Sequence, residues 1–174
     1  VNILVIHSHN ANRGDEAAVK AMVDELLIKY PGAKITISNN GFTPYPGMPE
    51  NVIQIDRFPK LESRIAQLEF FIVLLFKGKF ALTKEARKFI RALKEADVVL
   101  HAPGGPSIGD TYFKAEKLYL WRLNLIRRMG IPYIFYAPSM GPFNCASRNK
   151  LRKEVISGAE RIILRDPISV KYVK

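Results

Sequence analysis

The stretch that decides the fold is residues 1–30, VNILVIHSHNANRGDEAAVKAMVDELLIKY. It opens with Val1–Ile6, a short run of apolar and mostly β-branched residues that is typical of a buried strand. Polar, glycine-containing sequence follows as far as Asp15. Glu16–Tyr30 then has the residue spacing of an amphipathic helix, which Pro31 ends. The segment therefore predicts a strand, a loop and a helix.

The same alternation continues along the chain. Further strands are predicted at Lys34–Ser38, Val52–Ile55, Asp97–His101, Pro132–Tyr136 and Arg161–Leu164. Helices are predicted at Leu61–Phe76, Thr83–Ala96, Tyr112–Met129 and Ser147–Gly158. Thr83 is a candidate N-cap, and the Asn-, Gly- and Pro-rich segment Asn39–Pro49 is expected to be an exposed loop. This order predicts an α/β fold with a Rossmann-like, doubly wound parallel sheet, whose strand-to-helix loops gather at the carboxyl edge.

The composition bounds the architecture and the compartment. With 174 residues and 48% hydrophobic content, residues 1–174 are expected to form a single domain around one core. The single cysteine, Cys145, cannot form an internal disulfide, and Cys and His residues at metal-ligand spacing are absent. The sequence therefore predicts no metal site and a reducing compartment, the cytoplasm, with the inner face of the membrane as an alternative.

The charge balance favours anionic partners. Lys and Arg number 27 against 16 Asp and Glu, a net charge of +11, which suits phosphorylated small molecules, nucleic acid or an anionic membrane surface. No pattern of a nucleic-acid-binding motif accompanies the basic residues, so nucleic acid is not an expected partner. A solvated basic face is favoured over an anionic-substrate or membrane patch.

The longest apolar run, Phe70–Phe76, is far shorter than the roughly 20 residues that cross a bilayer. We expect a buried helix or a contact surface for another domain there. The alternative is an interfacial helix that makes a peripheral membrane contact.

Three loops after predicted strands are candidate anion-binding sites. In Asn10–Glu16 a glycine permits close backbone approach to an anion at the helix start, although capping by Asn12 or Asp15 is the favoured simple interpretation. Pro103–Asp110 holds three glycines and two prolines, which suits a phosphate or carboxylate, with a structural turn as the alternative. Ala137–Phe143 contains a Gly-Pro turn.

Arg165 leaves the end of the last predicted strand at the same edge. Its guanidinium suits bidentate binding of a carboxylate or phosphate, with an ion pair to Asp166 as the alternative. His7, His9 and His101 also stand at or just past strand ends. We expect them to pack beside the loops, the alternative being that they face the cleft.

Four motifs in order carry a family resemblance. N-x-G-D-E-A at Asn12–Ala17, the glycine loop with its following acid at Gly104–Asp110, S-x-G-P at Ser139–Pro142 and R-D-x-x-S at Arg165–Ser169 resemble the polysaccharide pyruvyl transferase family. The resemblance spans nearly the whole chain. It departs from the family at Pro103–Pro106, where two consecutive glycines stand in place of the three that members often show.

The resemblance implies the first half of a GT-B-like, two-domain enzyme. Such an enzyme transfers pyruvate from phosphoenolpyruvate to sugar hydroxyls of a cell-surface glycan as a ketal and releases phosphate. The chain ends at Lys174, where the family's second domain would begin, so that domain is expected to lie outside this chain and the isolated domain is expected to be inactive. No cofactor is implied beyond phosphoenolpyruvate as donor substrate, and the implied partners are this donor and a glycan acceptor, either free or lipid-linked.

By position in the motifs, the resemblance implies that Arg165 is the catalytic residue, an electrostatic clamp on the donor. It implies that the substrate-binding residues come from the three loops: Asn12, Gly14, Asp15, Gly104, Gly105, Asp110, Ser139, Gly141 and Pro142. Two alternatives stay open at this stage. One is a GT-B-type glycosyltransferase that uses a nucleotide sugar, and the other is a non-catalytic domain that binds an anionic glycan or membrane.

Overall fold

The computed structural model of the chain describes residues 1–40, 43–59 and 64–174. Its strands are β1 (Asn2–Ser8), β2 (Lys34–Asn39), β3 (Val52–Asp56), β4 (Val98–His101), β5 (Gly104–Ile108), β6 (Tyr133–Tyr136), β7 (Pro138–Met140) and β8 (Arg161–Ile163). Its helices are α1 (Arg13–Lys29), α2 (Arg64–Leu75), α3 (Lys84–Glu95), the 3-10 turn η1 (Asp110–Tyr112), α4 (Phe113–Met129), α5 (Ala146–Ser157) and α6 (Pro167–Val173).

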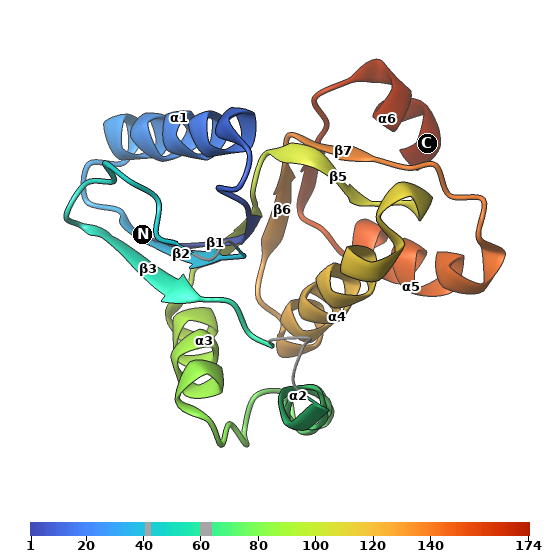
Figure 1. Cartoon of the computed structure of the whole chain (residues 1–174), viewed down its shortest axis with the longest axis horizontal. Helices are drawn as coiled ribbons and strands as arrows, with labels where there is room; N and C mark the ends of the chain where they lie inside the picture. Colours follow the sequence, from blue (N-terminus) through green and yellow to red (C-terminus); the bar gives the residue numbers. More distant parts are fainter. Residues whose placement is uncertain (41–42, 60–63) are drawn as a thin grey trace.

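Six strands form one parallel sheet in the order β3-β2-β1-β4-β6-β8 (Figure 1). This is the strand order of the Rossmann fold, and it confirms the predicted doubly wound sheet. The chain runs from β1 outward to β3, crosses back to β4, and then runs outward in the opposite direction. The carboxyl ends of β1 and β4 therefore flank the topological switch point, where folds of this kind bind ligands.

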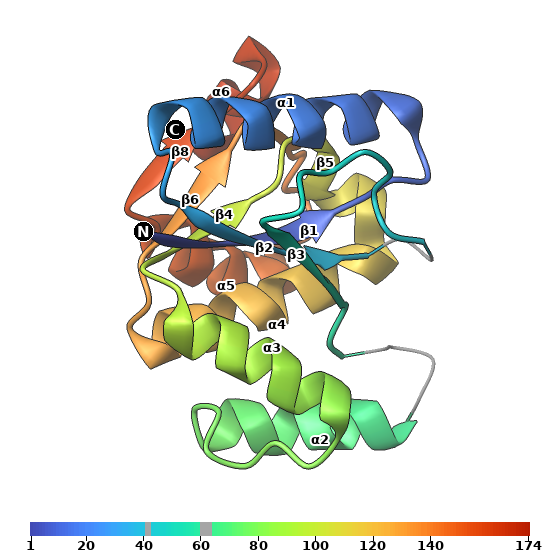
Figure 2. The same cartoon turned by 90° about the vertical axis from the view of Figure 1, so that its left-hand side faces the viewer.

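Helices cover both faces of this sheet. Helix α1 lies over one face, and α3 and α4 lie under the other (Figure 2). Adjacent residues of β1 belong to different cores, because successive side chains of a strand point to opposite faces. Ile3 and Val5 join the α1 core, whereas Leu4 and Ile6 join the core built with α2 to α5. Burial on both faces explains why β1 is apolar without alternation.

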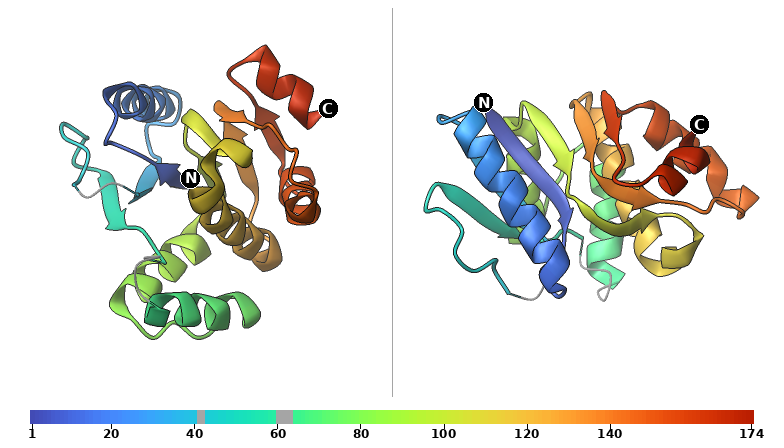
Figure 3. Two further views of the ribbon diagram at one scale, coloured as in Figure 1. Left: turned by 45° about the vertical axis from the view of Figure 1, so that its right-hand side comes forward. Right: turned by 90° about the horizontal axis from the view of Figure 1, so that it is seen from above.

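The structure corrects the expected loops Pro103–Asp110 and Ala137–Phe143, because each contains a short strand, Gly104–Ile108 and Pro138–Met140 respectively. β5 and β7 pair in parallel as a separate two-stranded sheet just past β4 and β6 (Figures 1 and 3). Their Gly and Pro content argues against a strand. The pairing forms nonetheless, with shifts in register, because β4 and β6 are already neighbours and deliver the two segments side by side.

The remaining differences lie at element ends. Helix α1 begins at Arg13 rather than Glu16, and α6 was not predicted because it spans only seven residues. Thr83 caps α3 as expected, its Oγ1 accepting from the Ala86 N–H at 3.2 Å. Leu61 at the start of the expected helix and positions 41–42 of the expected loop lie outside the described residues. Within the described ranges, no helix is both long enough and apolar enough to cross a bilayer.

Candidate functional site

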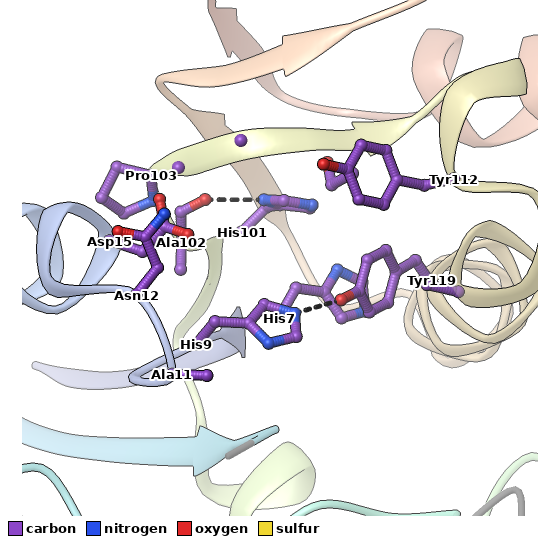
Figure 4. A pocket seen from close by; sticks show the side chains of 14 residues that line it. His7, His9, Ala11, Asn12, Asp15, His101, Ala102, Pro103, Tyr112 and Tyr119 are labelled. Atoms are coloured by element: carbon purple, nitrogen blue, oxygen red, sulfur yellow. Dashed lines mark hydrogen bonds between the residues drawn. The ribbon is translucent and has the colours of Figure 1, made fainter.

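A pocket of about 270 Å³ opens at the switch point between β1 and β4 (Figure 4). It is built from the carboxyl ends of these two strands, the start of α1, the start of β5 and the first turns before and within α4. The residues that line it are His7, His9, Ala11, Asn12, Asp15, His101, Ala102, Pro103, Gly104, Gly105, Ser107, Tyr112, Ala115 and Tyr119.

The first loop supplies the α1 side of the pocket. Asn12 is the N-cap of α1, and its Oδ1 accepts from the Gly14 N–H at 2.8 Å. The expected cap is therefore present, and its residue also lines the pocket. Asp15 stands in the first turn of α1 and is the only acidic side chain among the described lining residues.

The second loop enters the pocket at Gly104 and Gly105. Gly104 has φ +146°, in the left-handed half of backbone space where side chains are disfavoured. A Cβ on Gly104 would lie 2.9 Å from Asp15 Oδ1, whereas a Cβ on Gly105 would have open space. The first and second loops therefore meet directly, as their positions after neighbouring strands predict.

The third loop lies beside the second loop but outside the pocket lining. The Gly141 N–H donates to the Ile108 carbonyl at 2.8 Å, and the Asp110 N–H donates to the Pro142 carbonyl at 2.9 Å. Ser139 Oγ donates to Asp166 Oδ2 at 2.9 Å. The structure thus brings the three loops together, with Ser139, Gly141 and Pro142 bracing the loop that forms the pocket wall.

Asp110 takes part in a network of ion pairs that sequence analysis did not predict. Its Oδ1 accepts from Arg152 Nη2 at 2.6 Å, and this bond lowers the pKa of Asp110. Arg152 also donates to Glu116 Oε1 at 2.7 Å, and Arg148 donates to Glu116 Oε2 at 2.8 Å. Glu116 in turn accepts from the Gly109 N–H at 2.8 Å. The network ties the second loop to α4 and α5.

Arg165 is exposed in the short connection between β8 and α6. It precedes Asp166, the N-cap of α6, whose pKa is lowered chiefly by the bond from the Ser169 N–H. Arg165 is not among the described residues that line the pocket. It stands at the carboxyl end of the outermost strand, on the same edge of the sheet.

A cluster of rings lies at the base of the pocket, and it joins the three histidines named from the sequence to Tyr119, which was not predicted. His7, His9 and His101 reach it from the ends of β1 and β4, and Tyr119 reaches it from α4 (Figure 4). The rings of His7 and Tyr119 lie 4.2 Å apart, and those of His7 and His101 lie 4.7 Å apart. His9 Nε2 and the Tyr119 hydroxyl form a short hydrogen bond. The histidines therefore both pack beside the loops and face the pocket.

Several polar atoms of this cluster are buried without a hydrogen-bond partner among the described residues. His101 Nδ1 lies 2.9 Å from the Ala102 carbonyl, so Nδ1 carries the proton and Nε2 is a bare acceptor. His101 Nε2, both ring nitrogens of His7 and Ser107 Oγ have no partner. All three residues line the pocket. Because buried polar groups normally find partners, these atoms indicate a site for a polar ligand.

The histidines are uncharged at neutral pH. Burial lowers the pKa of His7 well below 6.5, that of His101 to about 4, and that of His9 by a smaller amount. Beneath them lies the buried Arg122, whose Nε donates to the Phe58 carbonyl at 2.6 Å. Burial lowers the pKa of Arg122 to about 9, so it stays protonated, and its charge further disfavours protonated His7 and His9.

The lining therefore offers hydrogen bonds rather than charge. No Lys or Arg is among the described lining residues, and Asp15 is the one acid. Neutral imidazoles, hydroxyls, an amide and the faces of aromatic rings match the hydroxyl groups and apolar C–H faces of a sugar. Sequence analysis gave the cleft as the alternative position of the three histidines, and the pairing of β1 with β4 is what brings them together.

Rossmann-like domains build their ligand sites at the carboxyl edge of the sheet, at the switch point where this pocket lies. The family model for polysaccharide pyruvyl transferases matches residues 12–174, from the cap of α1 to the end of the chain. The chain belongs to the polysaccharide pyruvyl transferase family. Comparisons with curated proteins and with solved structures found no match.

Proposed function

We propose that this chain is the acceptor-binding part of a transferase that moves pyruvate from phosphoenolpyruvate onto two hydroxyls of a glycan sugar. Family membership supports the transferase class and the polysaccharide acceptor. The observation that carries the assignment of the pocket is its lining, in which the described residues include three neutral histidines, two tyrosines and one acid but no cation. Such a lining suits an uncharged sugar, and Asp15 would repel a multiply charged donor.

The size of the pocket agrees with a single sugar unit. Sites for drug-sized ligands enclose about 300–1,000 Å³. At about 270 Å³ the pocket falls just below that range. We therefore assign it to the terminal sugar of the acceptor.

The chemistry needs a group that removes a proton from an acceptor hydroxyl. That oxygen attacks C2 of the enolpyruvyl group, and C3 gains a proton to become a methyl group. The second hydroxyl then attacks C2 and phosphate leaves. Of the two hydroxyl protons that are released, one balances the proton taken up at C3 and the other leaves with phosphate. In this proposal Tyr119 accepts the proton of the attacking hydroxyl and passes its own to His9 Nε2. His9 can accept it because its lowered pKa keeps the ring neutral.

Arg165 has a separate role in this proposal. Exposed at the carboxyl edge beyond β8, it would bind the carboxylate or phosphate of the donor from outside the acceptor pocket. The family resemblance implies that a second domain supplies the rest of the donor site across the cleft. Two differently charged substrates would then approach from the two sides of the cleft.

Two measurements test this function. For the chain itself, saturation-transfer NMR with galactose, mannose and their N-acetylated 2-amino relatives should show sugar contacts that Asn12→Ala or Ser107→Ala weakens, whereas contacts of phosphoenolpyruvate, made through Arg165 outside the pocket, should not respond to either change. For the full-length protein, incubation with phosphoenolpyruvate and a glycan should release phosphate and add the mass of pyruvate less water to the glycan. Release of a nucleoside diphosphate from a nucleotide sugar instead would identify a glycosyltransferase and overturn the proposal.

A further inference from the structure

Helix α2 presents an apolar face away from the rest of the protein. Its buried side chains are Glu69, Phe70 and Val73. On the opposite side Ile65 is 77% exposed and Leu68 is 64% exposed, and further exposed apolar residues follow at the spacing of one helix face. The outward-facing set is Ile65, Leu68, Phe71 and Leu75, continued past the helix by Phe76 and Phe80. We call these six residues the α2 apolar face.

This face belongs to an ordered part of the fold. Figure 2 shows α2 as the outermost element on its side of the molecule, beyond α3. The rings of Phe76 and Phe80 pack edge to face at 4.9 Å across the turn that ends the helix. That turn is fixed by a hydrogen bond of 2.8 Å from the Gly78 N–H to the Val73 carbonyl. The exposed rings are therefore held in place.

The α2 apolar face carries no acid, and exposed cations precede and follow it in the sequence. Glu69, the only acid within Arg64–Leu75, is buried and accepts from the Leu82 N–H at 2.6 Å and the Thr83 N–H at 2.7 Å. Residues 64–94 contain eight Lys and Arg and two Glu. The eight cations are all exposed: Arg64, Lys77, Lys79, Lys84, Arg87, Lys88, Arg91 and Lys94.

We propose that the α2 apolar face docks on an anionic lipid bilayer, with the flanking cations on the phosphate headgroups. Apolar side chains bordered by Lys and Arg are the pattern of a helix that lies in the membrane interface. Lysine is depleted at protein–protein interfaces, whereas anionic lipids attract each added Lys or Arg. The charge of the border therefore selects a bilayer over a protein partner. The proposal is independent of the function assigned to the pocket.

The chain contains its own probe for this event. Trp121 is its single tryptophan, and its ring lies 4.9 Å from that of Phe71 and 6.1 Å from that of Phe70, with Lys117 Nζ 4.6 Å above it. Insertion of the α2 apolar face should shift Trp121 emission to the blue. It should also bring Trp121 within reach of brominated acyl chains.

The test titrates the 174-residue chain with vesicles of phosphatidylcholine alone or mixed with phosphatidylglycerol. We expect the emission shift and co-sedimentation only with the anionic vesicles, and both should weaken as salt rises. Ile65→Glu should weaken binding at least about tenfold, because it places a charge in the buried interface. Ile28→Glu is the matched control, since Ile28 is 73% exposed on α1.

A second pair of variants tests the charge. Lys77→Glu with Lys79→Glu should weaken binding to anionic vesicles, whereas Lys29→Glu with Lys34→Glu makes the same change in net charge elsewhere and should have little effect. Equal effects of Ile65→Glu and Ile28→Glu, or an absence of vesicle binding, would overturn the proposal. So would concentration-dependent self-association that Ile65→Glu abolishes, because it would identify a protein partner for this face. Circular dichroism melts of every variant establish that each is folded.

Discussion

Gly104 passes the first turn of α1 so closely that a Cβ on residue 104 would lie 2.9 Å from Asp15 Oδ1. This approach joins the loop after β1 to the loop after β4 and brings the backbone against Asp15, the only acid among the described residues that line the pocket. The short motif around Asn12 and the glycine loop around Gly104 are thus two halves of one wall. The two motifs are far apart in the sequence, and the pairing of β1 with β4 makes them neighbours in the fold.

Replacing Gly104 by Ala should displace Asp15 and strain the backbone. The φ of +146° is unfavourable for any residue with a Cβ, so we expect the free energy of unfolding to fall by about 1–3 kcal/mol. Sugar binding should weaken as well, because the Asp15 carboxylate must move. Gly105→Ala is the control, since its Cβ would meet open space. Urea unfolding and sugar titration of both variants measure the difference, and identical behaviour would contradict the assigned contact.

The bond between His9 and Tyr119 predicts a specific kinetic defect in the full-length enzyme. Tyr119→Phe removes the hydroxyl that passes the proton, so kcat should fall on the order of a hundredfold while KM for the acceptor changes little. Tyr30→Phe, at the C-cap of α1 and not among the described residues that line the pocket, should leave kcat unchanged. Phosphate release at saturating acceptor provides the measurement. A Tyr119→Phe enzyme with normal kcat would exclude this proton route.

The buried His101 should make the protein sensitive to acid. Its folded-state pKa of about 4 lies below the ordinary 6.5, so the unfolded chain binds more protons between these values. The contribution of His101 to stability is therefore fully present above pH 6.5 and is lost as the pH falls towards 4. The shift corresponds to about 3 kcal/mol, an order-of-magnitude figure.

Urea unfolding of wild type and His101→Gln from pH 7.5 to 4 tests this expectation. The wild type should lose stability steadily below pH 6.5, and His101→Gln should show a shallower slope over the same range. His7, whose pKa is lowered by burial in the same direction, should sustain part of the slope in the variant. Parallel curves for the two proteins would mean that His101 titrates normally in the folded state.

The fold and the outline of the site follow from local patterns, whereas the chemistry of the pocket does not. The apolar runs at β1, β4 and β6, alternating with helices, predict a parallel sheet and place the three loops at one edge. Hydrophobic periodicity does not specify strand order, so no local pattern indicates that the rings of His7 and His101 meet edge to face at 4.7 Å. Asp110 shows the same limit, because its partner Arg152 is 42 residues away in the sequence.

The ion network around Glu116 should be essential for stability. Glu116 is fully buried and pairs with the guanidinium groups of Arg148 and Arg152, so Glu116→Gln leaves the buried Arg152 with only the partly exposed Asp110 as counterion. We expect a loss of about 3–5 kcal/mol in the free energy of unfolding. Glu154→Gln makes the same chemical change in the exposed pair with Arg127 and should cost less than about 1 kcal/mol. Comparable losses in the two variants would contradict the burial of the network.

A variant of Arg165 distinguishes two roles for this residue, namely binding of the donor and stabilisation of the loop before α6. A clamp made mainly in the transition state requires the planar, bidentate geometry of a guanidinium, which Lys does not reproduce at equal charge. In the full-length enzyme Arg165→Lys should therefore lower kcat on the order of a hundredfold, with an unchanged melting temperature because Arg165 is exposed. Arg161→Lys is the matched control. Arg161 is also exposed and lies four residues before Arg165, at the start of β8, so this change should leave kcat and the melting temperature unchanged. Phosphate release from phosphoenolpyruvate, measured together with thermal melts, distinguishes the two roles. A lower melting temperature with normal turnover would show that Arg165 stabilises the start of α6, and it would contradict a role in binding the donor.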